Sequence, residues 1–237
     1  MTLALVLGCG LLAGLLTTLA GLGGGLLLLL VLSAVWSPAE ALAITAPALL
    51  VGNLHRAWLG RTAIDRRVVR TFALGAVPGA LLGGLAAGLV SPAVVRGLLV
   101  ALTVLSLARA LAKVRVVLPR SALAAGGLVV GGLTGASGGA GVLAAPLLLS
   151  WGLLGRTYVA TGACCAAIMH VGRIVGYGAV GLFSPSVLGW AAVTTAAVVG
   201  GNCLGHGLRR LAERLPAGAL EHGVLAVCVT LALLGFA

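Results

Sequence analysis

The near-unbroken succession of apolar residues along the chain is the feature that most limits its fold. Glycine, proline and charged residues divide it into ten apolar segments, most of them long enough for the roughly 18 to 20 residues of a membrane-crossing helix. Only 8% of the 237 residues are charged, whereas a soluble domain carries about 25%. We therefore expect an all-α integral membrane protein with about ten transmembrane segments. They are 2–20, 24–36, 39–59, 69–90, 93–112, 122–136, 140–154, 157–181, 186–207 and 217–236.

The segments fall into two halves with the same rhythm, which indicates an internal duplication. We expect residues 1–115 and 121–237 to form two five-segment transmembrane repeats. Because five is odd, the repeats must enter the membrane with opposite topology, as in many secondary transporters. A shift of 116 residues places Gly10 on Gly126, Thr18 on Thr134, Gly23 on Gly139, Gly25 on Gly141, Thr45 on Thr161 and Gly60 on Gly176.

The basic residues predict the orientation of the chain. If all ten segments cross, twelve of the fifteen lie in loops on one side, and the positive-inside rule places that side in the cytoplasm and both termini outside the cell membrane. If instead segments 24–36 and 140–154 are re-entrant, the charge asymmetry largely disappears, so ten crossings fit better. The twelve are Arg61, Arg66, Arg67, Arg70, Arg109, Lys113, Arg115, Arg120, Arg156, Arg209, Arg210 and Arg214.

Two glycine clusters interrupt the apolar sequence at equivalent places in the two halves. They read G-L-G-G-G at residues 21–25 and G-A-S-G-G-A-G at residues 135–141. Glycine costs about 1 kcal/mol relative to alanine in a helix, so each cluster favours a helix break. Breaks in corresponding segments indicate a transporter's binding site, where half-helix N-termini favour an anion. Close helix packing is the alternative interpretation. The candidate substrate-binding residues here are Gly23, Gly24, Gly25, Ser137, Gly138 and Gly139.

Arginine residues inside apolar segments are the other candidates for a binding site, because a charge near the bilayer centre costs from about 3 to more than 10 kcal/mol. Arg56 and Arg173 occupy nearly matching positions of the two halves, and no carboxylate is obviously available to Arg173. We expect an anion to be the missing partner, with Arg173 as the main contact. Arg56 can instead extend to the interface, so we expect it to matter less. Arg96 is nearer a segment end and can pair with Glu40.

Polar residues near these arginines complete the candidate site. His170 precedes Arg173 by three residues, so both side chains share one helix face. Hydrogen bonds between helices are the alternative role for the polar residues of the crossings. The remaining candidates are Asn53, His55, Thr45 and Thr161.

The paired glycine clusters, the second followed by V-L-A-A-P-L-L-L, resemble the sulfite exporter TauE/SafE family over essentially the whole chain. The sequence departs from the family pattern at Leu30, where the second half has Pro146, and at Ala140, which replaces a glycine. The resemblance implies export of sulfite, sulfonates or related small organic anions, without a cofactor.

Three other functions remain as alternatives. An anion channel or a cation carrier has the same composition, although cation sites generally need carboxylates or rings of carbonyl groups. A rhomboid-like serine protease is suggested by G-A-S-G at residues 135–138, but the duplication explains this motif without catalysis. We expect no enzymatic activity, metal or nucleic acid; membrane lipid is a partner, and a homo-oligomer is left open. The five cysteines lack metal-ligand spacing.

Overall fold

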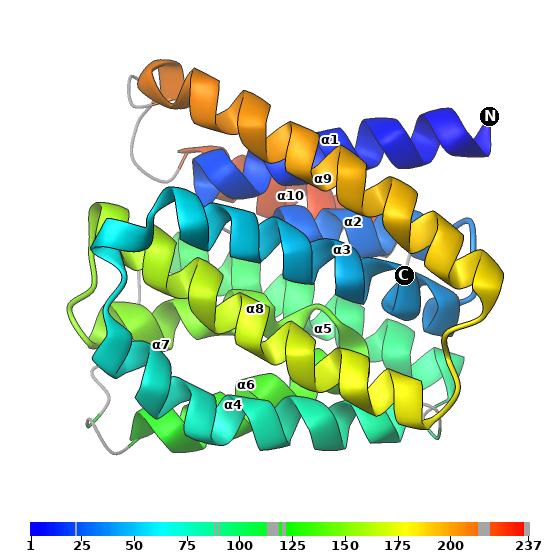
Figure 1. Cartoon of the computed structure of the whole chain (residues 1–237), viewed down its shortest axis with the longest axis horizontal. Helices are drawn as coiled ribbons and strands as arrows, with labels where there is room; N and C mark the ends of the chain where they lie inside the picture. Colours follow the sequence, from blue (N-terminus) through cyan, green and yellow to red (C-terminus); the bar gives the residue numbers. More distant parts are fainter. Residues whose placement is uncertain are drawn as a thin grey trace.

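The computed structural model describes residues 1–21, 23–87, 89, 91–112, 119, 122–212 and 219–234, and among these residues it contains helices joined by short turns and no strand. Ten α-helices and two short 3₁₀ turns follow one another (Figure 1). They are α1 (Thr2–Ala20), α2 (Gly24–Ser33), α3 (Pro38–Leu59), η1 (Arg61–Ala63), α4 (Arg66–Ala87), α5 (Pro92–Ala112), α6 (Ala122–Ser137), η2 (Ala140–Leu143), α7 (Ala144–Ser150), α8 (Gly155–Ala179), α9 (Pro185–Ala212) and α10 (Ala219–Leu233).

Four of these helices are long and apolar enough to cross a membrane, and several shorter ones are equally apolar. The four are Thr2–Ala20, Arg66–Ala87, Gly155–Ala179 and Pro185–Arg209. The all-helical membrane fold predicted from the sequence is therefore confirmed at this level. α2 has only 10 residues, a length of about 15 Å at 1.5 Å per residue, so the number of crossings stays a prediction.

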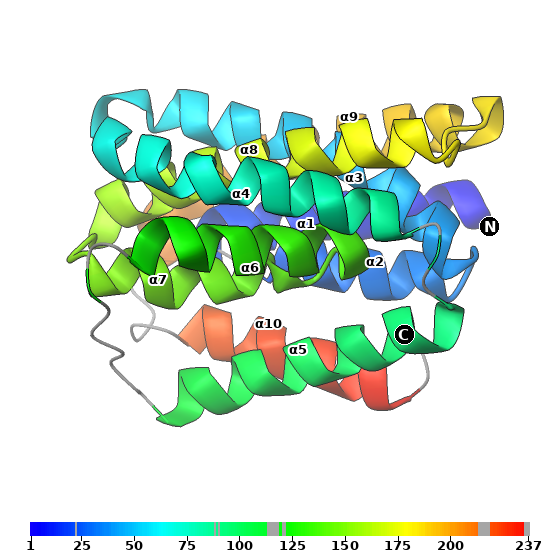
Figure 2. The ribbon, with the colours of Figure 1, turned by 90° about the horizontal axis from the view of Figure 1, so that it is seen from below.

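The chain reverses direction from helix to helix. α1, α3, α5 and α9 run from the end of the molecule that carries the N-terminus toward the other end, and α4, α6, α8 and α10 run back (Figures 1 and 2). The first helices of the two halves, α1 and α6, thus run in opposite directions. The division into repeats 1–115 and 121–237 stays a prediction, and its junction at 113–118 and 120–121 lies outside the described residues.

Glycine allows two helix pairs to pack at backbone contact. A Cβ atom added to Gly14 of α1 would lie 2.1 Å from the carbonyl oxygen of Val198 in α9. One added to Gly83 of α4 would lie 2.0 Å from the carbonyl oxygen of Gly132 in α6. Such separations exclude any side chain, so α1 with α9 and α4 with α6 use the small-residue packing common between membrane helices.

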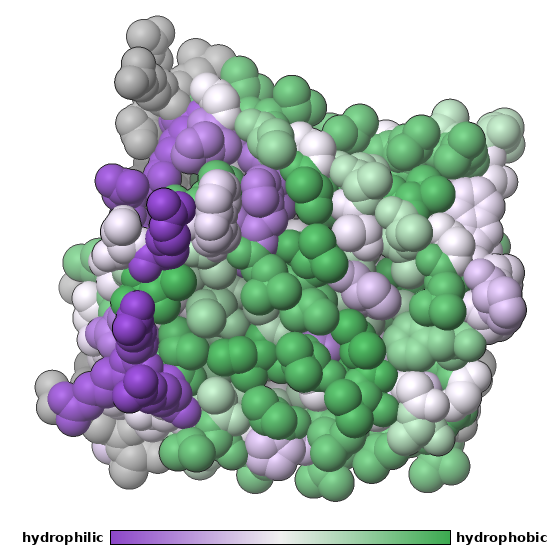
Figure 3. Space-filling view, in the orientation of Figure 1, coloured by the Kyte–Doolittle hydropathy of each residue, from purple (hydrophilic) through white to green (hydrophobic). Residues whose placement is uncertain are grey.

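The hydrophilic residues gather at one end of the molecule. On the face shown in Figure 3 they lie at the end where α3 and α9 finish and α4 and α8 begin, and apolar side chains cover most of the remaining surface. We call this the basic end; its described arginines are Arg61, Arg66, Arg67, Arg70, Arg156 and Arg209. The other predicted loop cations Lys113, Arg115, Arg120 and Arg214, and the side chains of Arg96, Arg109 and Arg210, lie outside the described residues.

Both described acidic side chains stabilise helix N-termini. The Oε2 atom of Glu40 accepts hydrogen bonds from Ser37 in a capping box that begins α3. The Oδ1 atom of Asp65 accepts from the amides of Arg67 and Val68 at the start of α4. The expected pairing of Glu40 with Arg96 involves a side chain outside the described residues.

Candidate functional site

A cavity of about 100 Å³ lies between the two glycine breaks, and we call it the central cavity. Residues of α1, α3, α6 and α8 line it together with both breaks, so both halves of the chain contribute. Neither of the two described carboxylates, on Glu40 and Asp65, is among the lining residues. They are Thr17, Gly21, Gly23, Gly25, Leu26, Leu49, Asn53, Arg56, Thr134, Gly138, Gly139, Gly141, Ala144, Ala145, Leu148, Tyr158, Val159, Gly162, Ala166, Met169 and His170.

The two breaks form because glycine adopts backbone angles that other residues avoid. Gly21 has φ of 86° and ends α1 as a left-handed cap, with its N–H bonded to the carbonyl oxygen of Thr17. Gly23 has φ of 92° and precedes α2, and Gly138, with φ of 75°, follows α6. Positive φ strains any side chain with a Cβ atom. The helix breaks predicted from the two clusters are thus present in both halves.

Among the described arginines, Arg56 alone lines the central cavity. Its side chain is 7% exposed. One terminal nitrogen donates to Oδ1 of Asn53 at 3.0 Å, and the other donates to the carbonyl oxygen of Gly21 at 3.0 Å. The Nε atom of Arg56 is buried without a hydrogen-bond partner. A buried guanidinium with an unused donor thus lies at the first glycine break.

The N-terminus of α2 faces the same space. The first intrahelical bond of α2 runs from the amide of Leu27 to the carbonyl oxygen of Gly23, so the amides of Gly24, Gly25 and Leu26 precede it. Gly25 and Leu26 line the cavity. Free amides and the positive end of the helix dipole favour negative charge at such a position.

His170 adds a neutral donor from α8. Its Nδ1 atom lies 3.2 Å from a terminal nitrogen of Arg173. Because an arginine nitrogen can only donate, Nδ1 accepts, and Nε2 carries the ring proton. His170 lines the central cavity, so this side chain offers a hydrogen-bond donor to a ligand there.

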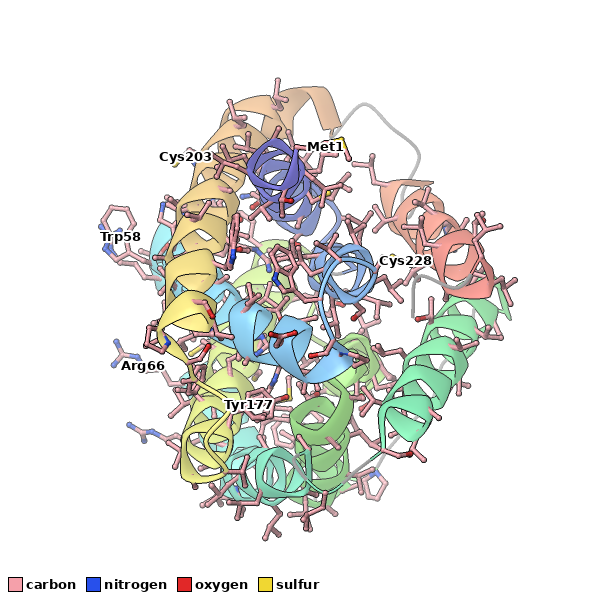
Figure 4. The ribbon with its side chains drawn as sticks, turned by 90° about the vertical axis from the view of Figure 1, so that its right-hand side faces the viewer. Met1, Trp58, Arg66, Tyr177, Cys203 and Cys228 are labelled. Atoms are coloured by element: carbon pink, nitrogen blue, oxygen red, sulfur yellow. The ribbon has the colours of Figure 1, made fainter. Side chains whose placement is uncertain are left out.

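Arg173 lies behind the cavity wall, where protein atoms satisfy its donors. It is 0% exposed and is not among the lining residues. Its Nε donates to the hydroxyl oxygen of Tyr177 at 3.1 Å. The terminal nitrogen that does not face His170 donates to the carbonyl oxygen of Leu42 at 3.2 Å and to Thr45 Oγ1 at 3.5 Å. Tyr177 points into the helix bundle in Figure 4. All these partners are neutral.

A model of the family described as sulfite exporter TauE/SafE matches residues 6–234. The chain belongs to this family. No curated protein and no solved structure matches the chain. TauE/SafE proteins are transporters, so the prediction of a multi-pass membrane transporter rather than an enzyme is supported at the level of the family.

The remaining predicted site residues of this TauE/SafE chain lie outside the cavity lining. Thr45 bonds to Leu42 and Arg173, and Thr161 accepts from the amide of Asp65 at 2.9 Å. Ser137 Oγ donates to the carbonyl oxygen of Leu133 within α6 at 2.7 Å. These side chains therefore serve helix packing in this conformation.

His55 and Gly24 also fall outside the cavity. The His55 ring stacks on Trp58, with 6.5 Å between ring centroids, and Trp58 is 59% exposed and projects from the surface in Figure 4. A Cβ atom on Gly24 would lie 2.1 Å from Thr17 Oγ1, so close packing explains this glycine. The predicted residues that do line the cavity are Gly23, Gly25, Asn53, Arg56, Gly138, Gly139 and His170.

Sequence reasoning did not select several residues that line the cavity of this TauE/SafE chain, including Thr17, Thr134, Tyr158 and Met169. Thr134 could have been selected, because the duplication aligns it with another threonine, Thr18. No sequence pattern pointed to Tyr158 or Met169. Among the described residues, no group of three His, Cys, Asp or Glu side chains could hold a metal ion.

Proposed function

We propose that this TauE/SafE protein is a secondary exporter of a small anion such as sulfite or a sulfonate. The observation that carries the proposal is the central cavity, which is lined by the buried Arg56 and by no carboxylate of the described part of the chain. The anion binds to Arg56 at the first glycine break, with the N-terminus of α2 and His170 as further donors.

Charge balance supports an anionic substrate. A buried cation that lacks a charged partner is costly, and its removal from water is repaid when an opposite charge binds. The two described carboxylates, on Glu40 and Asp65, bond to backbone amides at the starts of helices. Asn53 and Gly21 supply only neutral acceptors. A bound anion would neutralise this charge.

The size and lining of the cavity suit a small ion. The cavity volume of about 100 Å³ is several times larger than the roughly 10 to 15 Å³ that a single water molecule needs. Leu26, Leu49 and Met169 provide apolar walls. A sulfonate could place its oxygen atoms at Arg56 and a short apolar group against these walls.

Two inverted five-helix repeats would allow the site to open to either side of the membrane in turn. This proposal is supported by matching contacts in the two halves: α1 packs on α9 as α6 packs on α4. The pairs Asn53 with Arg56 and His170 with Arg173 have the same three-residue spacing and hydrogen-bond the same way. We propose that the basic end lies in the cytoplasm and both termini outside.

A ligand screen with the purified full chain tests the proposal. Saturation with a ligand at a hundred times its Kd stabilises a protein by about 2.7 kcal/mol. We expect sulfite or a sulfonate to raise the thermal unfolding midpoint. We do not expect matched carboxylates to be the only anions that raise it. Arg56→Gln should abolish this shift. Arg61→Gln is the matched control, because Arg61 stacks over Trp58 at the surface and lines neither glycine break.

Stabilisation of Arg56→Gln by the same ligands, to the same extent as the wild type, would place the anion elsewhere. If no anion in the screen changes the unfolding midpoint, the proposal of an anionic substrate loses its support.

A further inference from the structure

A second cavity of about 50 Å³ adjoins the central one at the basic end. We call it the basic vestibule. Arg56, Arg156, His206 and Arg209 are its basic lining residues, and no carboxylate lines it among the residues that the structure describes. The others are Thr18, Leu59, Gly60, Val159 and Ala160.

Arg56 and Val159 line both cavities, so they form the wall between the vestibule and the central cavity. The Nε atom of Arg56 is buried in this wall and has no hydrogen-bond partner. Its two terminal nitrogens are held by Asn53 and Gly21. An anion on either side of the wall would therefore meet the same guanidinium.

Local structure explains the position of Arg209 but not that of Arg156. Arg209 lies near the C-terminus of α9, where the helix dipole favours a cation. Arg156 lies in the first turn of α8, a helix of 25 residues with no acidic residue in that turn and no side-chain cap at its N-terminus. A cation there opposes the dipole. An anion bound in the vestibule would interact favourably with both Arg156 and this helix end.

From this arrangement we infer that the basic vestibule is a second binding site for a small oxyanion, from which Arg56 passes the ion to the central cavity. The inference rests on the proposed anion transport. Positive charge gathered in a concave site raises the local concentration of anions and their rate of association, and salt weakens this effect. The vestibule thus sets how efficiently the exporter collects its substrate on the side of the basic end.

Sulfite efflux from proteoliposomes in which the basic end faces the lumen tests the inference. The double variant Arg156→Gln/Arg209→Gln should raise the half-saturating sulfite concentration about tenfold, a typical loss when charges that steer or bind an ion are removed. The half-saturating concentration of the double variant should also depend less on ionic strength than that of the wild type. Arg61→Gln removes a charge from the same end but not from the vestibule, and should match the wild type.

If the double variant behaves as Arg61→Gln in both measurements, the vestibule is not a substrate site. Failure of the underlying transport proposal looks different: Arg56→Gln would then transport sulfite as the wild type does.

A lipid phosphate has chemistry similar to that of a free oxyanion, and thermal unfolding in detergent separates the two. We expect sulfite to stabilise the wild type more than the double variant, and added phosphatidylglycerol to stabilise both equally. Stabilisation by phosphatidylglycerol that disappears in the double variant, with the sulfite effect unchanged, would assign the vestibule to a headgroup and overturn the inference.

Discussion

Two buried arginines of this chain have different surroundings and should have different roles. Arg56 borders both cavities and keeps an unused donor. Arg173 is fully enclosed and connects α8 to α3 through Leu42 and Thr45. Tyr177 extends this network, because its hydroxyl group donates to the carbonyl oxygen of Gly135 at 2.7 Å. We therefore propose Arg56 as the substrate contact and Arg173 as a structural residue.

We expect Arg173→Ala to unfold more readily than Arg56→Gln. Arg173→Ala leaves buried hydrogen-bond partners unsatisfied, at about 1 to 3 kcal/mol for each group, and empties the space of a large buried side chain, whereas Arg56→Gln keeps a long polar side chain. Thermal unfolding without ligand ranks the variants, and unfolding with sulfite reports binding. Wild-type stability of Arg173→Ala, with loss of only the response to sulfite, would contradict a structural role for Arg173.

The sequence identified both arginines but ranked them in the opposite order. Depth in the membrane and the lack of an acidic partner favoured Arg173, and both are properties of sequence position. The acceptors of Arg173 lie on α3 and on Tyr177, and a contact between α3 and α8 cannot be read from either segment alone.

At the scale of helices, glycine has two separate functions that the sequence could not distinguish. The clusters at 21–25 and 135–141 break helices, as predicted. Gly14 and Gly83 instead bring α1 onto α9 and α4 onto α6. Glycine spacing reports that close approach is possible, while the partner helix follows only from the tertiary structure. Residues that line the central cavity, such as Tyr158, likewise could not be selected from the sequence, because their neighbours on other helices follow only from the tertiary structure.

Substitution of Gly83, which packs α4 against α6, should push these two helices apart. We expect Gly83→Ala to destabilise the protein by about 1 to 3 kcal/mol, the usual cost of overpacking, because its Cβ atom would lie 2.0 Å from the carbonyl oxygen of Gly132. Gly8→Ala in α1 is the control, since nothing lies within 4 Å of its added Cβ atom. Unfolding in detergent should show this order, and equal stability of the two variants would argue against the packing.

At the scale of the molecule, helix directions place the η1 turn and the α8–α9 connection at opposite ends (Figures 1 and 2). If all ten segments cross, these two connections lie on opposite sides of the membrane. Eight crossings, with segments 24–36 and 140–154 re-entrant, would put both on one side.

Labelling of single cysteines in a variant that lacks the five native ones tests this topology. An impermeant thiol reagent should label Ser184→Cys in intact cells and should label Thr62→Cys only after the membrane is opened, because the basic end is predicted to be cytoplasmic. Both positions are exposed in the structure. Labelling of both from outside would contradict ten crossings.

The membrane potential could drive export without a pH gradient. Moving one elementary charge through 100 mV is worth about 2.3 kcal/mol, so a potential negative inside favours exit of an anion. The described carboxylates, Glu40 and Asp65, cap helices at their N-termini and do not line the central cavity.

The most direct test of the account is sulfite efflux from proteoliposomes under an imposed potential, negative inside, with equal pH on both sides. The wild type and Arg61→Gln should release sulfite faster than protein-free liposomes, and Arg56→Gln should not. Efflux through Arg56→Gln at the wild-type rate would contradict the central claim that the anion passes through the cavity at Arg56.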